Sequence, residues 1–509
     1  MVELLRRAFA HRKDDVAFVH GATRTTYGEI AATTYAFARA LRTIGLGSGD
    51  SVSILSPNRP EVFAISAAVQ FAGGRYTPLN PYASAADQAF ILDDSEARIV
   101  VYHSSLAERA EELRELGVEA AFVPFETDDR RTGLVEQARQ ESDSPIAGTR
   151  HPDELAVLNY SGGTTGTPKG IMLSHRAVTR SVTTMLSEWQ LPANIRILLC
   201  SPLSHAAGAL VIPTMIRGGT VHVHEKFDPG AVLDAIENDG VNMLIGVPTM
   251  LYALLDALKA EDRDISGLET FAYGSAPVSP ARLAEGIERF GNVFMQHYAQ
   301  GEAPMTVTML PKEDHDLDRP ELLRSCGTPT IGTRLALLDD EGDPVPAGEE
   351  GEICVQGDLV MDGYWKRSEE TAAALRGGWL RTGDVAKQDD EGYVYIVDRK
   401  KDMIISGGFN VYSREVEDVL TSHHAVRQAA VIGVPDSRWG EMVHAVIVVE
   451  DGAEIADNEI IDLVRREKGA VHAPKTMVRV DSLPMTAVGK IDKKRLRAEH
   501  WGDASRQVN

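Results

Sequence analysis

Cysteine is scarce in this chain of 509 residues: Cys200, Cys326 and Cys354 stand far apart. Because no two of them form a C-x-x-C pair, the sequence argues against a disulfide scaffold and a zinc site, and it favours a reducing compartment. The first residues lack the apolar segment of a secretory signal, and no apolar run is long enough to span a membrane. These absences predict a cytoplasmic protein.

Positive charge is also in short supply. The chain has 52 Lys and Arg against 75 Asp and Glu, a net charge of −23, which speaks against nucleic acid or an anionic membrane as a partner. From residue 399 to the C-terminus the charges balance at 17 of each sign, so the whole negative excess lies before it. A neutral C-terminal piece on an acidic body fits a lid that tolerates anionic ligands, although chance surface composition gives the same balance.

The length exceeds what one hydrophobic core supports, so two or more domains are expected. Short apolar runs alternate with stretches of helical spacing over most of the chain, which predicts parallel α/β layers. Around residues 335–400, strand-like segments separated by acidic turns predict a β-rich subdomain. The expected strands are Val52–Leu55, Ile99–Tyr102, Leu155–Leu158, Arg196–Leu199, Met243–Val247, Leu335–Asp340, Gly351–Gln356 and Tyr393–Val397, and an expected helix covers Glu61–Ala72.

A domain boundary is expected near Asp398. Gly407 and Gly408 form a loop beyond it, and Ser413 is a suitable N-cap for a helix through Glu415–Leu420. The segments that follow are predicted as strands at Ala429–Val434, Ala445–Val449 and Met477–Val480 and a helix at Asn458–Lys468. The prediction is a large α/β domain at residues 1–397 and a small α+β domain at residues 398–509.

The most informative stretch is Tyr-Ser-Gly-Gly-Thr-Thr-Gly-Thr-Pro-Lys-Gly at residues 160–170. Glycines such as Gly163 let backbone amides crowd an anion. Ser161, Thr164 and Thr165 add hydroxyl donors, and Lys169 adds a positive charge suited to phosphate. The stretch is not a Walker motif, because Gly170 follows the lysine where that motif needs Ser or Thr. A flexible surface turn is the other interpretation.

This stretch resembles the phosphate loop of the adenylate-forming superfamily, which includes acyl-CoA synthetases, peptide-synthetase adenylation domains and luciferases. Further stretches match the same superfamily in the same order along nearly the whole chain. The resemblance, strongest to the AMP-dependent acyl-CoA synthetases, implies a two-step reaction. A carboxylic acid and ATP with Mg²⁺ give an acyl-adenylate, and coenzyme A then forms the thioester and releases AMP.

The resemblance also assigns nucleotide-binding residues. The segment at residues 273–277, with Gly274, Ser275 and Ala276, would lie along the adenine, although small residues there also suit a tight turn. Tyr298 would stack on the adenine beside Ala299. Glu302 would hold Mg²⁺ on the ATP phosphates. Asp384 would accept hydrogen bonds from the ribose hydroxyls, and Arg399 would be a second contact to ribose or phosphate.

Other matching positions concern the acid and coenzyme A. His205 would line the carboxylate site, although a lone histidine is more often structural. Lys490 would reach the carboxylate and the α-phosphate, where a cation neutralises charge in the transition state. The small domain would be a mobile lid that turns about Asp398, and Gly407 and Gly408 would let the pantetheine arm pass.

The chain departs from the family pattern next to the metal-binding glutamate. Ala299 replaces a usual glycine, and Gly301 replaces a threonine whose hydroxyl touches the α-phosphate in the family. Losing a hydrogen bond to a charged group removes roughly 1.5–3 kcal/mol, or about ten- to a hundredfold in rate if it acts in the transition state. One hypothesis is that adenylation is impaired while a preformed acyl-adenylate still reacts with coenzyme A. The alternative is that water or a neighbouring hydroxyl replaces the threonine.

The expected substrate is a small-molecule carboxylic acid, or its adenylate, with a bulky apolar part. Small or apolar residues occupy the candidate pocket positions, and no aspartate near residues 205–210 is placed to hold an amino acid's ammonium group. Loading of a carrier protein and non-catalytic nucleotide binding remain alternatives, and a homodimer is left open. The candidate pocket positions are Ala206, Ala207, Gly208, Ala209, Val247, Ala276, Ala299 and Ala303.

Overall fold

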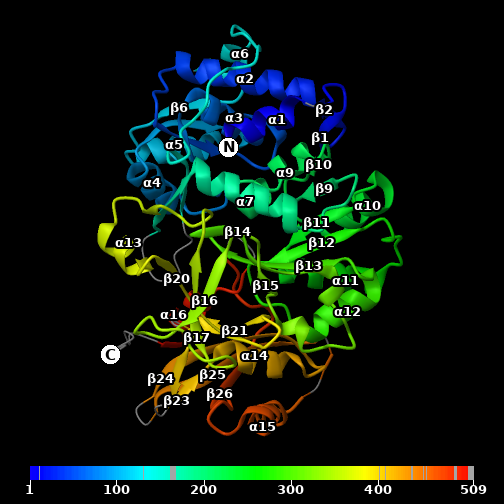
Figure 1. Ribbon diagram of the computed structural model, residues 1–509. Coiled ribbons are helices and arrows are strands. Elements are labelled where there is room, and N and C mark those ends of the chain that lie inside the picture. Colours follow the sequence, from blue (N-terminus) through cyan, green and yellow to red (C-terminus); the bar gives the residue numbers. More distant parts are fainter. Residues whose placement is uncertain are drawn as a thin grey trace.

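The computed structural model describes residues 1–10, 12–129, 131–160, 168–399, 402–406, 409–436, 439–450, 452–453, 455–486 and 490–501. Within these ranges the strands form four sheets, with helices packed against them (Figure 1). The principal helices are α1 (Val2–Ala10), α2 (Tyr27–Thr43), α3 (Pro60–Ala72), α4 (Ala85–Asp94), α5 (Ala107–Glu115), α6 (Leu134–Ala138), α7 (His175–Glu188), α8 (Ala206–Ala209), α9 (Val211–Ile216), α10 (Pro229–Asp239), α11 (Pro248–Ala260), α12 (Pro280–Phe290), α13 (Ser368–Ala374), α14 (Ser413–Thr421), α15 (Asp457–Lys468) and α16 (Lys493–Trp501).

Two large sheets confirm the predicted α/β layers. Most strand pairs in the first part of the chain are parallel, with helices as connections, and apolar strands such as Ser51–Leu55 and Met243–Gly246 are buried on both faces. One sheet has the order β15-β14-β13-β12-β11-β9-β10-β1-β2 and the other β18-β8-β7-β4-β3-β5-β6. Their bounds are β1 (Val16–His20), β2 (Thr23–Thr26), β9 (Arg196–Leu199), β10 (Thr220–Val223), β11 (Met243–Gly246), β12 (Thr270–Gly274), β13 (Phe294–Gln300), β14 (Ala303–Leu310), β15 (Thr328–Pro329), and β3 (Ser51–Leu55), β4 (Arg75–Pro78), β5 (Ala97–Tyr102), β6 (Ala121–Pro124), β7 (Leu155–Tyr160), β8 (Gly170–Ser174), β18 (Gly363–Tyr364).

The β-rich region expected around residues 335–400 is an antiparallel sheet of the order β16-β17-β20-β19, with β21 paired to β20. Predicted and observed bounds agree for Gly351–Gln356 and shift by a few residues elsewhere. β21 is the last strand of this sheet along the chain, and the C-terminal elements follow it. Its strands are β16 (Arg334–Leu338), β17 (Gly351–Gln356), β19 (Leu375–Arg376), β20 (Trp379–Gln388) and β21 (Val394–Arg399).

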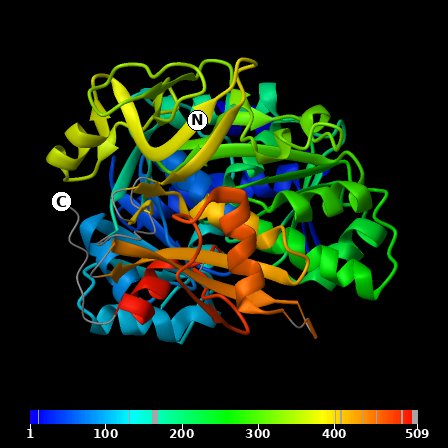
Figure 2. The same ribbon diagram turned by 90° about the horizontal axis from the view of Figure 1, so that it is seen from below.

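The C-terminal elements form a fourth sheet, of the order β23-β22-β25-β24 with β26 beside β25, and have hydrophobic clusters of their own. Figure 1 shows α14, α15 and β24–β26 below β21, at the end of the molecule opposite α1–α3, and Figure 2 shows these orange and red segments from below. The strands are β22 (Ile404–Ser406), β23 (Phe409–Val411), β24 (Val426–Asp436), β25 (Gly440–Val449) and β26 (Thr476–Arg479).

The predicted N-cap of α14 is wrong. Tyr412 occupies the cap position without a side-chain hydrogen bond, and Ser413 is the first helical residue. The Ser413 hydroxyl donates instead to Asp398 Oδ2 at 2.9 Å and accepts from Lys493 Nζ at 2.7 Å. Because Asp398 also accepts from the Ser413 amide, a buried carboxylate takes over the capping role that the serine side chain was expected to play.

Candidate active site

Asp384 accepts hydrogen bonds from strands of two sheets, β13 of one sheet and β21 of its own. Its carboxylate is 3% exposed on β20 and accepts the Tyr298 hydroxyl at 2.7 Å and the Gln300 amide at 2.6 Å, both on Oδ2. Arg399, its register partner on β21, donates to Oδ1 at 3.1 Å. Burial and the Asp384 charge raise the pKa of Tyr298 well above its usual value, so its hydroxyl is a neutral donor. Two of the predicted nucleotide residues, Tyr298 and Arg399, therefore hydrogen-bond to a third, Asp384.

Gln300 was not among the predicted site residues. It lies two residues after Tyr298 on β13, where the pairing with β14 shifts register. Its amide also donates to the Thr382 carbonyl at 2.9 Å. Because the irregularity depends on how the strands pair, no local pattern in the sequence could have placed Gln300 here.

The charge of Lys490 acts on two histidines. Burial first, and then the charge of Lys490, lower the pKa values of His205 and His297 to about 4. His205 lies at the start of α8, and its Nδ1 bonds the Ser204 hydroxyl at 3.0 Å. Its side chain reaches solvent although protein surrounds it on most sides, as expected for the wall of an open site. Lys490 thus influences a residue 285 positions earlier in the chain that the sequence also predicted at the carboxylate site.

His297 is a further neighbour that the sequence did not predict. Its Nδ1 lies 2.8 Å from the Met305 carbonyl, and because a carbonyl only accepts, Nδ1 carries the proton and Nε2 the lone pair. The ring packs against Gly274 on the adjacent strand, where a Cβ would lie 2.4 Å from the His297 carbonyl oxygen. Close packing between β12 and β13 therefore requires glycine at 274. The following residue, Ser275, has a positive φ of 67° and turns the chain toward α12.

Glu302 stands in the tight turn between β13 and β14, and its Oε1 accepts the Tyr364 hydroxyl at 2.8 Å. Lys169 pairs with Glu370 at 2.7 Å and lies 5.2 Å from the centre of the Tyr364 ring. Within the described ranges no three metal-binding side chains gather. A single carboxylate suits Mg²⁺ that takes its remaining ligands from phosphate oxygens and water, and does not suit an all-protein metal site.

Gly301 packs against Ile171 of β8. A Cβ at Gly301 would lie 2.6 Å from Ile171 Cδ1, well inside van der Waals contact. Ile171 is fully buried in a hydrophobic cluster with Tyr298 and Ala303. An isoleucine methyl therefore occupies the space into which a side chain at position 301 would project.

Part of the predicted site lies outside the described residues, namely Ser161, Gly163, Thr164, Thr165, Gly407 and Gly408. The ends of the predicted phosphate loop are described: β7 ends at Tyr160 and β8 begins at Gly170. These two strands, β7 and β8, are antiparallel neighbours. The apolar run Leu155–Leu158 had predicted the first of them.

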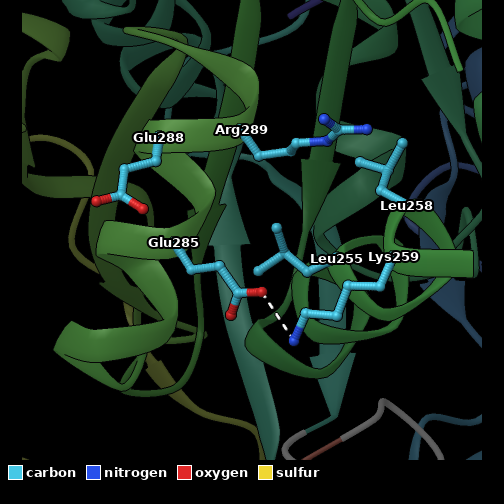
Figure 3. Close-up of a pocket in the computed structure, with 6 residues that line it drawn as sticks. All are labelled: Leu255, Leu258, Lys259, Glu285, Glu288 and Arg289. Carbon is cyan, nitrogen blue, oxygen red and sulfur yellow. Dashed lines mark ion pairs between the residues drawn. The ribbon is translucent and has the colours of Figure 1, made fainter. Parts of the chain in front are cut away.

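A surface hollow between α11 and α12 lies apart from these residues (Figure 3). Its lysine, Lys259, pairs with Glu285 at 2.9 Å, and Arg289 pairs with Asp262 at 3.0 Å. These neighbours neutralise the cations that face the hollow. The residues that line this hollow include none of the predicted site residues.

Comparison with known proteins identifies the family of the chain. The model of the AMP-binding enzyme family matches residues 5–365, and that of the AMP-binding enzyme C-terminal domain matches residues 415–490. The chain belongs to the AMP-binding enzyme family. This AMP-binding enzyme is 44% identical to the medium/long-chain-fatty-acid–CoA ligase FadD8 of Mycobacterium tuberculosis (strain ATCC 25618 / H37Rv), over 98% of this chain and 89% of that protein.

A feruloyl-CoA synthase of Amycolatopsis sp is 39% identical, over 94% of each chain. Among solved structures, the amide bond synthetase McbA from Marinactinospora thermotolerans superposes with a TM-score of 0.90 at 35% identity, over 98% of this chain and 99% of that one. The AMP-binding enzyme described here is accordingly an AMP-forming acyl-CoA synthetase that uses ATP, an acyl-adenylate and coenzyme A. No helix among its described residues has the length and apolar character needed to cross a membrane.

Proposed function

We propose that this acyl-CoA synthetase acts on a carboxylic acid with a bulky apolar part, and that its adenylation step is slow. The observation that carries slow adenylation is at Gly301, which has no side chain. The methyl group of Ile171 lies where a side chain at this position would project. A methyl group cannot donate a hydrogen bond to the α-phosphate. A preformed acyl-adenylate, which has already passed this step, is then the better substrate.

The remaining site residues have roles that do not depend on position 301. Asp384, held by Tyr298 and Arg399, binds the ribose. Lys490 neutralises charge on the carboxylate and the α-phosphate, beside His205 and His297, which are uncharged at neutral pH. Glu302 would hold Mg²⁺, which neutralises phosphate charge when bound.

The lid movement is part of the proposal. The chain passes from β21 to β22 directly after Asp398, and the C-terminal sheet has its own core. Rotation of residues 398–509 about Asp398 would withdraw Lys490 and bring the loop at Gly407 and Gly408 to the thioester-forming site. The effect of the Lys490 charge on the pKa of His205 supports the interpretation that the present arrangement belongs to adenylation.

The apolar substrate rests on the small residues near His205 and on the relatives. A Cβ at Gly208 would lie 2.0 Å from the Leu203 carbonyl oxygen, so glycine is required there for packing. Ala207 and Ala303 are buried, whereas Val247, Ala276 and Ala299 are partly exposed. The fatty-acid and feruloyl relatives have names that specify acids with large apolar parts.

The experiment separates the two half-reactions. Acid-dependent ATP–pyrophosphate exchange measures adenylation, and formation of the CoA thioester from a synthetic acyl-adenylate measures the second step. We expect exchange about ten- to a hundredfold slower than thioester formation from the adenylate of the same acid. Exchange as fast as the second step, across a panel of fatty and aromatic acids, would overturn slow adenylation. Thioester formation confined to short polar acids would overturn the substrate class.

A further inference from the structure

Tyr364 lies near three segments of the proposed site: β8, the turn that carries Glu302, and the segment that carries Lys169. It ends the short strand β18, and its register partner on β8 is Ile171, the residue that packs on Gly301. Its amide donates to the Thr371 hydroxyl at 2.9 Å, which fastens its backbone to α13. The side chain is partly buried against the cluster that contains Ile171. The pairing with β8 and the hydrogen bond to α13 therefore fix the position of Tyr364.

The hydroxyl and the ring of Tyr364 each contact a different residue of the proposed phosphate site. The hydroxyl donates to Glu302 Oε1 at 2.8 Å, and the ring lies 5.2 Å from Lys169 Nζ. A neutral donor on one carboxylate oxygen restricts rotation of the Glu302 side chain. A cation over an aromatic ring is attracted by the ring's negative face, so the same residue also restrains Lys169.

This restraint matters because glycine precedes Glu302. Gly301 has no side chain to limit its backbone, and the next residue carries the carboxylate that would hold Mg²⁺. The Met361 amide donates to the Glu302 carbonyl at 2.8 Å and holds its main chain. The Tyr364 hydroxyl is the contact that holds the carboxylate itself.

We propose that Tyr364 is a positioning residue that sets the Glu302 carboxylate and Lys169 for the metal-bound phosphates of ATP, and thereby preserves adenylation in a chain with glycine at 301. The proposal rests on the adenylation site described above, yet it does not require adenylation to be slow. It predicts that metal·ATP binding depends on the Tyr364 hydroxyl, while reaction of the acyl-adenylate with coenzyme A does not.

The test uses Tyr364→Phe in the full chain, which removes the hydroxyl and keeps the ring over Lys169. Binding of Mn²⁺·ATP is followed by electron paramagnetic resonance of the Mn²⁺, a readout that needs no turnover. We expect Mn²⁺·ATP affinity to fall about tenfold, since a hydrogen bond to a charged group is lost. The Mg²⁺ concentration for half-maximal exchange should rise by a similar factor, and thioester formation from the adenylate should stay within twofold of the native rate.

Tyr393→Phe is the matched control, because the Tyr393 hydroxyl also donates to a carboxylate, Asp314, at 2.8 Å, away from the site. This variant should leave Mn²⁺·ATP affinity and both half-reactions unchanged. Unchanged Mn²⁺·ATP affinity in Tyr364→Phe would overturn the proposal, as would an equal loss in both half-reactions, which indicates general damage to the fold. Fast exchange in the native chain would refute slow adenylation and leave this test intact.

Discussion

Restoring threonine at position 301 tests the slow-adenylation proposal only if Ile171 changes with it. In Gly301→Thr the new Cβ would lie 2.6 Å from Ile171 Cδ1, where contacts of 3.4–4 Å are ordinary. Ile171 is fully buried, so its end methyl must rotate into neighbouring side chains. Overpacking of this kind costs about 1–3 kcal/mol of the free energy of unfolding. The single variant therefore combines a new hydroxyl with a distorted site.

Ile171→Val removes the methyl that clashes. Alone it leaves a small void and costs about 0.5–1.5 kcal/mol. In the double variant the threonine fills that void, so the two costs should largely cancel. A double-mutant cycle in urea should show a favourable coupling of about 1–3 kcal/mol between positions 171 and 301. Additive costs would refute the packing argument.

The activity readout is ATP–pyrophosphate exchange with the best acid substrate. The double variant should exchange about ten- to a hundredfold faster than Ile171→Val alone, because a hydroxyl again reaches the α-phosphate. Ile171→Val combined with Gly301→Val is the matched control, since valine has the shape of threonine without the hydroxyl. Equal exchange rates in the threonine and valine double variants would refute the role assigned to the missing hydroxyl. Thioester formation from the adenylate should be the same in all of them.

Three further outcomes are expected. Lys490→Ala should raise the pKa of His205 above about 4, seen in NMR titration, because the lysine charge contributes to lowering it, and should abolish exchange. Ser413→Ala should lower the free energy of unfolding by about 1.5–3 kcal/mol in urea, since it removes a hydroxyl that is hydrogen-bonded to two charged groups, Asp398 and Lys493, and a smaller loss would contradict the structural importance of this link. The free energy of unfolding should fall as the pH drops from 6.5 towards 4, because the buried histidines take up protons there in the unfolded chain and not in the folded one. His222→Leu should make the fall of this free energy with pH less steep, by about 1.4 kcal/mol per pH unit near pH 5. The buried histidines with pKa values of about 4 are His175, His222, His297, His315 and His444.

Local patterns predicted the elements well and their long-range contacts poorly. Arg196–Leu199 and Gly351–Gln356 match β9 and β17 because apolar runs bounded by turns are set by neighbouring residues. That the charge of Lys490 acts on His205 was expected only from the family resemblance, since no spacing encodes it. Ser413 misled the prediction because a cap propensity cannot register Asp398, fifteen residues earlier, as a competing acceptor.

The partners that the sequence did not reveal share a physical cause. Tyr364 reaches Glu302 across 62 positions, and it does so from a strand of two residues, too short to leave a periodic pattern. In the sequence, Ile171 looks like any other core residue. Its importance comes from its contact with Gly301, which lies elsewhere in the chain. Such pairs exist only once the sheets are assembled, so a single sequence does not specify them.

The arrangement divides the site into two parts that can fail separately. In the proposed site, Asp384 with its hydrogen-bond donors Tyr298 and Arg399 would serve the AMP part of any ligand, whether ATP or acyl-adenylate. Glu302 and Lys169 would serve the phosphates that only ATP brings, and Tyr364 contacts both residues. Gly301 lies on the strand connection between Tyr298 and Glu302, so a change there alters the ATP part without disturbing the ribose contacts. An enzyme built in this way can lose rate with ATP and keep its affinity for acyl-adenylate, which is why AMP binding alone cannot distinguish the two substrates and the half-reactions can.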